Sequence, residues 1–172
     1  MQWFSFSTVL EPCIVVLLLG AAWTDIAHRL IPNWLCLSIA VAGAILRLAV
    51  GPTELLEAFA FGMSVLFLLW PLFSRNMIGG GDLKLLAAIA IALPLPGIVQ
   101  MFAITALAGG VLVLVHLAMR RLPPPRLSHS QASVLRRVYA IERWRILRHA
   151  PLPYGVAIAC GGTWALFSSI GV

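Results

Sequence analysis

Long runs of apolar residues, separated by short polar segments, dominate this chain. Six apolar segments can be distinguished, at about 9–24, 34–50, 55–73, 83–93, 98–119 and 153–170. Each run is continuous and does not alternate with polar residues, which favours helices over the strands of a membrane barrel. Several runs are shorter than the roughly 20 residues of an upright transmembrane helix. The pattern predicts an all-α, polytopic membrane helix bundle of about six transmembrane helices.

The composition supports a membrane protein. Hydrophobic residues make up 61% of the chain and charged residues 10%, whereas a soluble domain carries roughly 25% charged residues. We expect a single membrane-embedded domain over residues 1–172. No cleaved signal peptide is expected, because no Lys or Arg precedes the first apolar run. Cys13, Cys36 and Cys160 are scattered without metal-ligand spacing, so neither a metal site nor a disulfide framework is expected.

The positions of the charges predict the topology. The net charge of +6 fits a nucleic acid or an anionic lipid as partner at first sight. With six spans, however, all of the 12 basic residues except Arg47 fall on the loops of one side. Basic residues mark the cytoplasmic loops of membrane proteins. We therefore expect both termini outside, Asp25 and Asp82 at the cytoplasmic side, and no nucleic-acid partner.

A basic loop, residues 120–150, separates the last two apolar segments and contains most of these arginines. It opens with Leu122-Pro123-Pro124-Pro125, which is a stiff and extended spacer. One interpretation is a segment that lies on anionic lipid headgroups. The other is a solvated loop that only fixes the topology, and the sequence leaves both open.

Two aspartates next to apolar segments are the candidate functional groups. Only 6 residues of the chain are acidic, and a carboxylate in a membrane helix is costly and usually marks function. If Pro12 and Pro94 mark the outer ends of their helices, Asp25 and Asp82 each lie roughly 18–20 Å from that end and thus at one level. Simpler interpretations exist for each aspartate: Asp25 could pair with Arg29 one turn later, and Asp82 could cap the fourth helix.

A pair of carboxylates can hydrolyse peptide bonds. If Asp25 and Asp82 meet, they share one proton, because two like charges in a partly desolvated site repel each other. One carboxylate can then activate water as a base while the other donates a proton to a carbonyl oxygen. The glycines of 79–81 allow positive φ angles and close backbone approach. No Gly-Lys-Ser/Thr sequence follows them, which argues against a nucleotide site.

The residues around the aspartates allow several roles. Lys84 can act on Asp82 or on an acidic group of a substrate, or simply extend toward lipid headgroups. Arg29 either orients Asp25 or follows the charge rule for topology. Asn33, directly after Pro32, is expected to cap the second helix, with a substrate contact as the alternative.

Three parts of the sequence resemble one family. The motif Gly79-x-Gly81-Asp82 resembles that of the GxGD membrane aspartyl proteases, and the full run 79–85 resembles type IV prepilin peptidases. Asp25 with 29–33 is similar to the first catalytic segment of that family, and 153–159 is similar to its last characteristic helix. The resemblance implies that Asp25 and Asp82 are the catalytic pair. It implies supporting positions at Gly79, Gly81, Lys84, Arg29, Pro32, Asn33, Pro153, Tyr154 and Gly155.

The resemblance also implies a substrate and a location. The substrate would be a prepilin or pilin-like protein with a short basic leader followed by an apolar helix. Cleavage would follow a glycine at the cytoplasmic face of the bacterial inner membrane, with no cofactor and no metal. Pilus assembly or secretion machinery would be the wider partner.

One difference from the longer, two-activity members of the family concerns the first connection. Those members carry a cytoplasmic insertion there, often with two Cys-x-x-Cys pairs, whereas here the connection is only about 25–33. The short connection resembles the peptidases of tight-adherence (Flp-type) pilus systems. It argues against N-methylation of the product, against use of S-adenosylmethionine and against zinc.

The sequence therefore predicts a prepilin leader peptidase that uses water as nucleophile. Two other classes of function stay open. A presenilin-like intramembrane aspartyl protease would cut within a span and not at a leader junction. A non-enzymatic proton relay or scaffold would use the same aspartates without cleaving a peptide bond.

Overall fold

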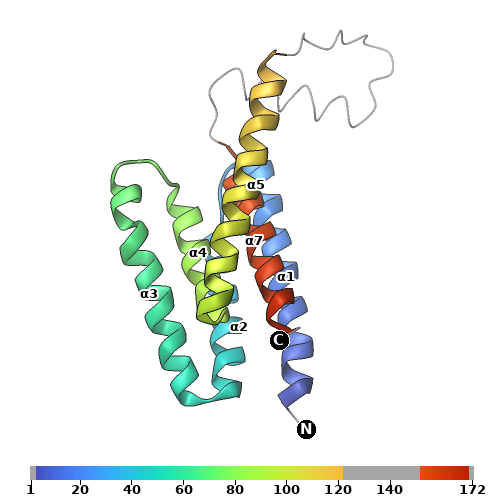
Figure 1. Ribbon diagram of the computed structural model, residues 1–172, viewed down its shortest axis with the longest axis vertical. Coiled ribbons are helices and arrows are strands. Elements are labelled where there is room, and N and C mark those ends of the chain that lie inside the picture. Colours follow the sequence, from blue (N-terminus) through green and yellow to red (C-terminus); the bar gives the residue numbers. More distant parts are fainter. Residues whose placement is uncertain (1–2, 122–151, 171–172) are drawn as a thin grey trace. The chain divides into compact units, whose positions relative to one another are not determined.

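The computed structural model describes residues 3–121 and 152–170. All secondary structure in these residues is helical (Figure 1). The helices are α1 (Trp3–His28), α2 (Asn33–Val50), α3 (Pro52–Ser74), α4 (Gly80–Ala92), α5 (Leu95–Arg121) and α7 (Tyr154–Ile170). Each of the six predicted apolar segments coincides with one of these helices, so the prediction of an all-α polytopic bundle is confirmed.

Four of the helices are long and apolar enough to cross a membrane, namely α1, α2, α3 and α5. The other two are shorter: α4 has 13 residues and the apolar stretch of α7 is Tyr154–Ser168. The side of the membrane on which the termini lie stays a prediction.

The chain divides into two compact units, with the boundary inside α5. The first unit comprises residues 1–108 and 153–172, and the second comprises 109–152. Both aspartates belong to the first unit. Most of the predicted basic loop lies outside the described residues, so its interpretations are untested.

The first helix begins earlier than the sequence indicated. It starts at Trp3 and not at about Val9, and it continues through Pro12, which is therefore not the outer end of this helix. A proline within a helix removes one backbone hydrogen bond, and the apolar residues on both sides continue the helix past it. The depth of Asp25 therefore cannot be counted from Pro12.

The first helix ends at a residue in the left-handed conformation. Arg29 has φ of 56°, and its backbone N–H donates to the carbonyl of Asp25 at 2.9 Å. A left-handed residue just after the last turn is a common helix end. Pro32 then adopts an extended conformation with ψ of 140°, and α2 begins at the next residue. These features produce the short, sharp connection between α1 and α2.

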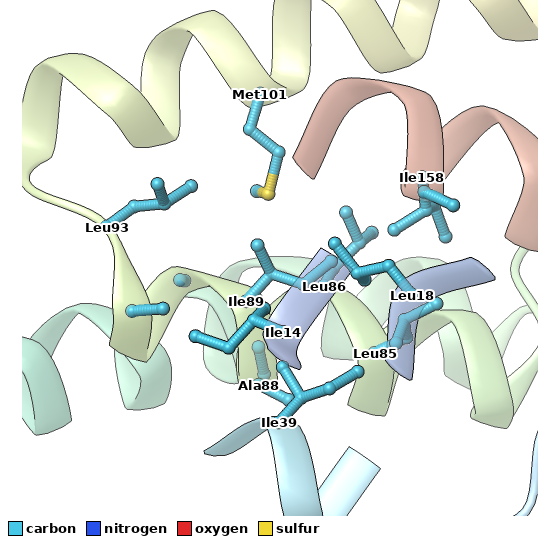
Figure 2. Close-up of a cluster of buried hydrophobic side chains, with 14 of the residues drawn as sticks. Ile14, Leu18, Ile39, Leu85, Leu86, Ala88, Ile89, Leu93, Met101 and Ile158 are labelled. Carbon is cyan, nitrogen blue, oxygen red and sulfur yellow. The ribbon is translucent and has the colours of Figure 1, made fainter. Parts of the chain in front are cut away.

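Helix α4 forms the centre of the first unit. It packs against α2, α3 and α7, while α1 packs against α2 and α7. Figure 2 shows the apolar side chains that meet in this core: Ile14 and Leu18 from α1, Ile39 from α2, Leu85 and Ile89 from α4, and Ile158 from α7. Most residues of α4 after its first turn are buried, so the position of this helix is fixed on several sides.

The contact between α2 and α4 depends on a glycine. A Cβ atom on Gly43 would lie 2.8 Å from the Cβ of Ala92, which is too close for two carbon atoms. Small residues that let helices approach each other in this way are typical of membrane bundles.

Candidate active site

Asp25 lies on the buried face of α1. The side chains of Ile14, Leu18 and Ala21 precede it at helical spacing, and all of them are fully buried. Asp25 continues this row with an exposed fraction of only 6%. The apolar pattern that packs α1 into the core therefore also carries this carboxylate inside.

A backbone group from the other end of the chain binds Asp25. The N–H of Gly155 donates to Oδ2 of Asp25 at 2.8 Å, and the bond is buried. Gly155 is the second residue of α7, where backbone N–H groups have no partner within the helix. The partial positive charge at a helix N-terminus also favours a carboxylate at this position.

Only glycine fits at this contact. A Cβ atom on Gly155 would lie 2.9 Å from both Cβ and Oδ2 of Asp25. Carbon atoms in favourable contact are about 3.5–4.0 Å apart, so any larger side chain would push the carboxylate away. In the sequence, only the family resemblance indicated Gly155. The role of its backbone N–H depends on the packing of α7 against α1, which the sequence does not show.

Asp82 lies in the first turn of α4 and is half-buried. The residue at the N-cap position is Gly79, and no side-chain hydrogen bond caps this helix. The simpler interpretation of Asp82 as the cap of the fourth helix is therefore wrong, because Asp82 is already inside the helix. Its carboxylate stays near Gly79, where a Cβ atom would lie 3.0 Å from Oδ2.

The glycine run serves close packing. None of the described glycines adopts the left-handed conformation, so the positive φ angles that glycine allows are not used at 79–81. Instead, a Cβ on Gly81 would lie 3.1 Å from Cβ of Ile31, and one on Gly80 would lie 3.1 Å from the ring of Phe73. Sequence reasoning missed the part played by Ile31, because only the fold brings it to α4.

The contact between Gly81 and Ile31 brings the two aspartates together. Ile31 belongs to the connection that follows α1, and Gly81 directly precedes Asp82. Asp25 and Asp82 are close enough for their charges to interact. The charge of Arg29 also acts on Asp25. The site thus contains two shielded carboxylates from antiparallel parts of the chain.

Lys84 and Asn33 form a separate polar contact. Nζ of Lys84 donates to Oδ1 of Asn33 at 3.0 Å. The expectation that Asn33 caps the second helix is wrong, because Pro32 occupies the N-cap position and no side chain caps α2. Lys84 follows Asp82 by two residues, which places the two side chains about 200° apart around α4. Lys84 therefore lies on the other side of this helix from the aspartate.

The remaining predicted residues lie at the start of α7. The carbonyl of Pro153 accepts a hydrogen bond from the N–H of Val156 at 3.2 Å, which forms the first turn. Tyr154 is 42% exposed. These two residues directly precede Gly155 at the start of α7.

Comparison with known proteins identifies the family of the chain. The model of the type IV leader peptidase family matches residues 13–114, which is more than half of the chain and includes both aspartates. A "Prepilin leader peptidase/N-methyltransferase" of Xanthomonas campestris pv. campestris is 31% identical over 117 residues. The matched region covers 64% of this chain and 40% of that relative, so the chain spans less than half of its length. No solved structure matches. The chain belongs to the type IV leader peptidase family.

Proposed function

We propose that this protein is an aspartyl endopeptidase that removes the leader of prepilins or pilin-like proteins, with Asp25 and Asp82 as its catalytic pair. The observation that carries the proposal is the pair itself: two shielded carboxylates on different helices whose charges interact. Membership of the leader peptidase family supports the substrate class.

The surroundings of the two carboxylates differ, and this difference supports separate roles. Asp25 accepts a hydrogen bond from the N–H of Gly155 at the start of α7 and feels the charge of Arg29. Both features stabilise a negative charge. Asp82, whose charge is opposed by that of Asp25, is the better holder of the shared proton. Asp25 is therefore the base and Asp82 the acid in our proposal.

The chemistry then follows in two steps. Asp25 takes a proton from a water molecule as the water oxygen attacks the carbonyl carbon of the scissile peptide, while Asp82 gives its proton to the carbonyl oxygen. In the second step Asp25 returns its proton to the amide nitrogen, the C–N bond breaks, and Asp82 recovers a proton from the tetrahedral intermediate. No covalent bond to the enzyme forms, and the carboxylates end as they began.

The place of the reaction belongs to the same proposal. The distribution of basic residues supports an active site at the cytoplasmic face of the bacterial inner membrane, and pilus assembly or secretion machinery would receive the product. The connection between α1 and α2 spans only residues 29–32, which supports a peptidase without N-methyltransferase activity and without a cofactor. Among the described residues, no group of three or more His, Cys, Asp or Glu could hold a metal ion.

A cleavage assay tests the proposal. The purified chain in lipid nanodiscs is given a prepilin with a basic leader, and the cut bond is mapped by mass spectrometry. Wild type should cut at the leader junction, while Asp25→Asn and Asp82→Asn should each lose roughly 10²–10⁴-fold in kcat. Glu57→Gln is the matched control, because it removes an exposed carboxylate of α3 and should leave the rate unchanged.

Two results would contradict the proposal. If folded Asp25→Asn or Asp82→Asn still cut at the wild-type rate, the pair is not catalytic and a relay or scaffold takes its place. If the wild type cuts within the apolar helix of the substrate and not at the leader junction, the chain acts as a presenilin-like protease.

A further inference from the structure

An apolar groove lies beside α4, and neither aspartate is among its lining residues. It is bounded by α2, α3 and α4 and has a volume of about 590 Å³. Its wall is formed by apolar residues such as Leu37, Phe59 and Met63. Only one end is polar, where Lys84 and Asn33 make their hydrogen bond.

The polar end of the groove offers hydrogen-bond donors. The ammonium group of Lys84 has three N–H donors, and the contact with Asn33 uses one of them. The amide of Asn33 accepts this bond through its oxygen, so its NH₂ group remains a donor. Trp34, also in the lining, adds an indole N–H. No carboxylate lines the groove, so this end favours an anion with several acceptor oxygens.

The position of this end along α2 fits the membrane boundary. Asn33 is the first residue of α2, which is long and apolar enough to cross a membrane. Trp34 is 61% exposed, and tryptophan is enriched at the level of the lipid headgroups. The apolar part of the groove runs from there along the helices toward the bilayer interior.

We propose that this groove binds an anionic phospholipid, with the phosphate at Lys84 and Asn33 and an acyl chain along α2, α3 and α4. Charge complementarity favours an anionic headgroup, because Lys84 carries the one positive charge among the lining residues and no carboxylate is among them. The long apolar wall favours a ligand with an acyl chain, since a free phosphate ion would not contact this wall. This site is separate from the predicted basic loop.

A substrate helix fits the groove less well. Lys84 and Asp82 project from α4 about 200° apart. The intervening start of α4 is closed by the packing of Gly81 on Ile31 and of Gly80 on Phe73. A peptide lying in the groove would have to pass around this packed turn to reach the carboxylates.

The experiment follows the fluorescence of Trp34 in the full chain. The other five of the six tryptophans are replaced by Phe, and the protein is placed in nanodiscs with rising fractions of phosphatidylglycerol or phosphatidylcholine that carry brominated, quenching acyl chains. Half-maximal quenching should need roughly fivefold less phosphatidylglycerol than phosphatidylcholine. Lys84→Gln should remove this preference.

Arg75→Gln is the matched control. Arg75 is an exposed residue at the C-terminal end of α3, so its loss removes one positive charge without touching the groove, and the preference should remain. Native mass spectrometry of the chain with all its tryptophans measures which lipid is retained. It compares phosphatidylglycerol with phosphatidylcholine without the Phe replacements.

Three results would overturn the proposal. Equal quenching by both lipids in the parent chain would mean that the groove does not select anions. Equal loss of preference in Lys84→Gln and Arg75→Gln would mean that only the overall charge matters. No quenching by either lipid would mean that a protein, such as a second copy, covers the groove. None of these outcomes depends on peptidase activity, so the proposal can fail independently of the proposed function.

Discussion

Replacing Gly155 by alanine tests the most specific feature of the site. The new Cβ atom would lie 2.9 Å from Cβ of Asp25, and relief of this overlap requires a shift of about 0.6–1 Å to reach ordinary carbon–carbon contact. Such a shift breaks the 2.8 Å hydrogen bond from the Gly155 N–H. Hydrogen bonds to charged groups contribute about 1.5–3 kcal/mol. If the bond acts in the transition state, kcat should fall roughly 10- to 150-fold.

The assay is steady-state cleavage of a prepilin in nanodiscs, with kcat and KM determined separately. We expect KM to stay near the wild-type value, because Gly155 acts on the carboxylate and not on the substrate. Gly110→Ala is the matched control, since a Cβ atom at Gly110 meets no atom within 4 Å, and its kcat should stay within about twofold of wild type.

A second variant separates the hydrogen bond from the packing. Replacing residue 155 by glycolic acid turns the amide into an ester, which deletes the N–H and adds no atom. If the bond stabilises the ionised form of Asp25, this variant should also lose activity, and its pH profile should move to higher pH on the acidic side. Full activity of the ester variant would refute the role given to the Gly155 N–H.

Three further predictions follow from the same structure. The rate of cleavage should fall at both low and high pH, because the reaction needs Asp25 ionised and Asp82 protonated, and a rate that stays constant toward either end would contradict the shared-proton mechanism. Ile89→Ala should lower the free energy of unfolding by about 2–5 kcal/mol, because this side chain is fully buried in the core; denaturation in mixed micelles measures the loss, and a change below about 1 kcal/mol would show that the site collapses or is not packed. Arg47 and Glu54 form an ion pair of 2.7 Å, and a double-mutant cycle with Arg47→Gln and Glu54→Gln should give a coupling of about 1 kcal/mol, whereas additive effects would mean that the pair adds nothing to stability.

The helices themselves could be predicted because each depends on local sequence. Continuous apolar runs gave all six, and the boundaries of α2 and α7 differ from expectation by one residue at most at their starts. The expectations were wrong where one residue type can occur in more than one structural position. The depth estimate for Asp25 takes Pro12 as the outer end of the first helix, but Pro12 lies inside α1. Asn33 is a residue type that often caps helices, but its side chain accepts a hydrogen bond from Lys84, which is 51 residues away in the sequence.

The sequence by itself determined the class of the protein and the identity of its two candidate carboxylates. Apolar length and charge placement are local properties, and a rare aspartate beside an apolar run stands out without any structure. The tertiary structure alone decided what surrounds them. The N–H of Gly155 donates to Asp25, which is 130 residues away in the sequence. Ile31, in the connection between α1 and α2, packs on Gly81 of α4. Such contacts arise from the way α1, α4 and α7 pack together, and no local pattern encodes that arrangement.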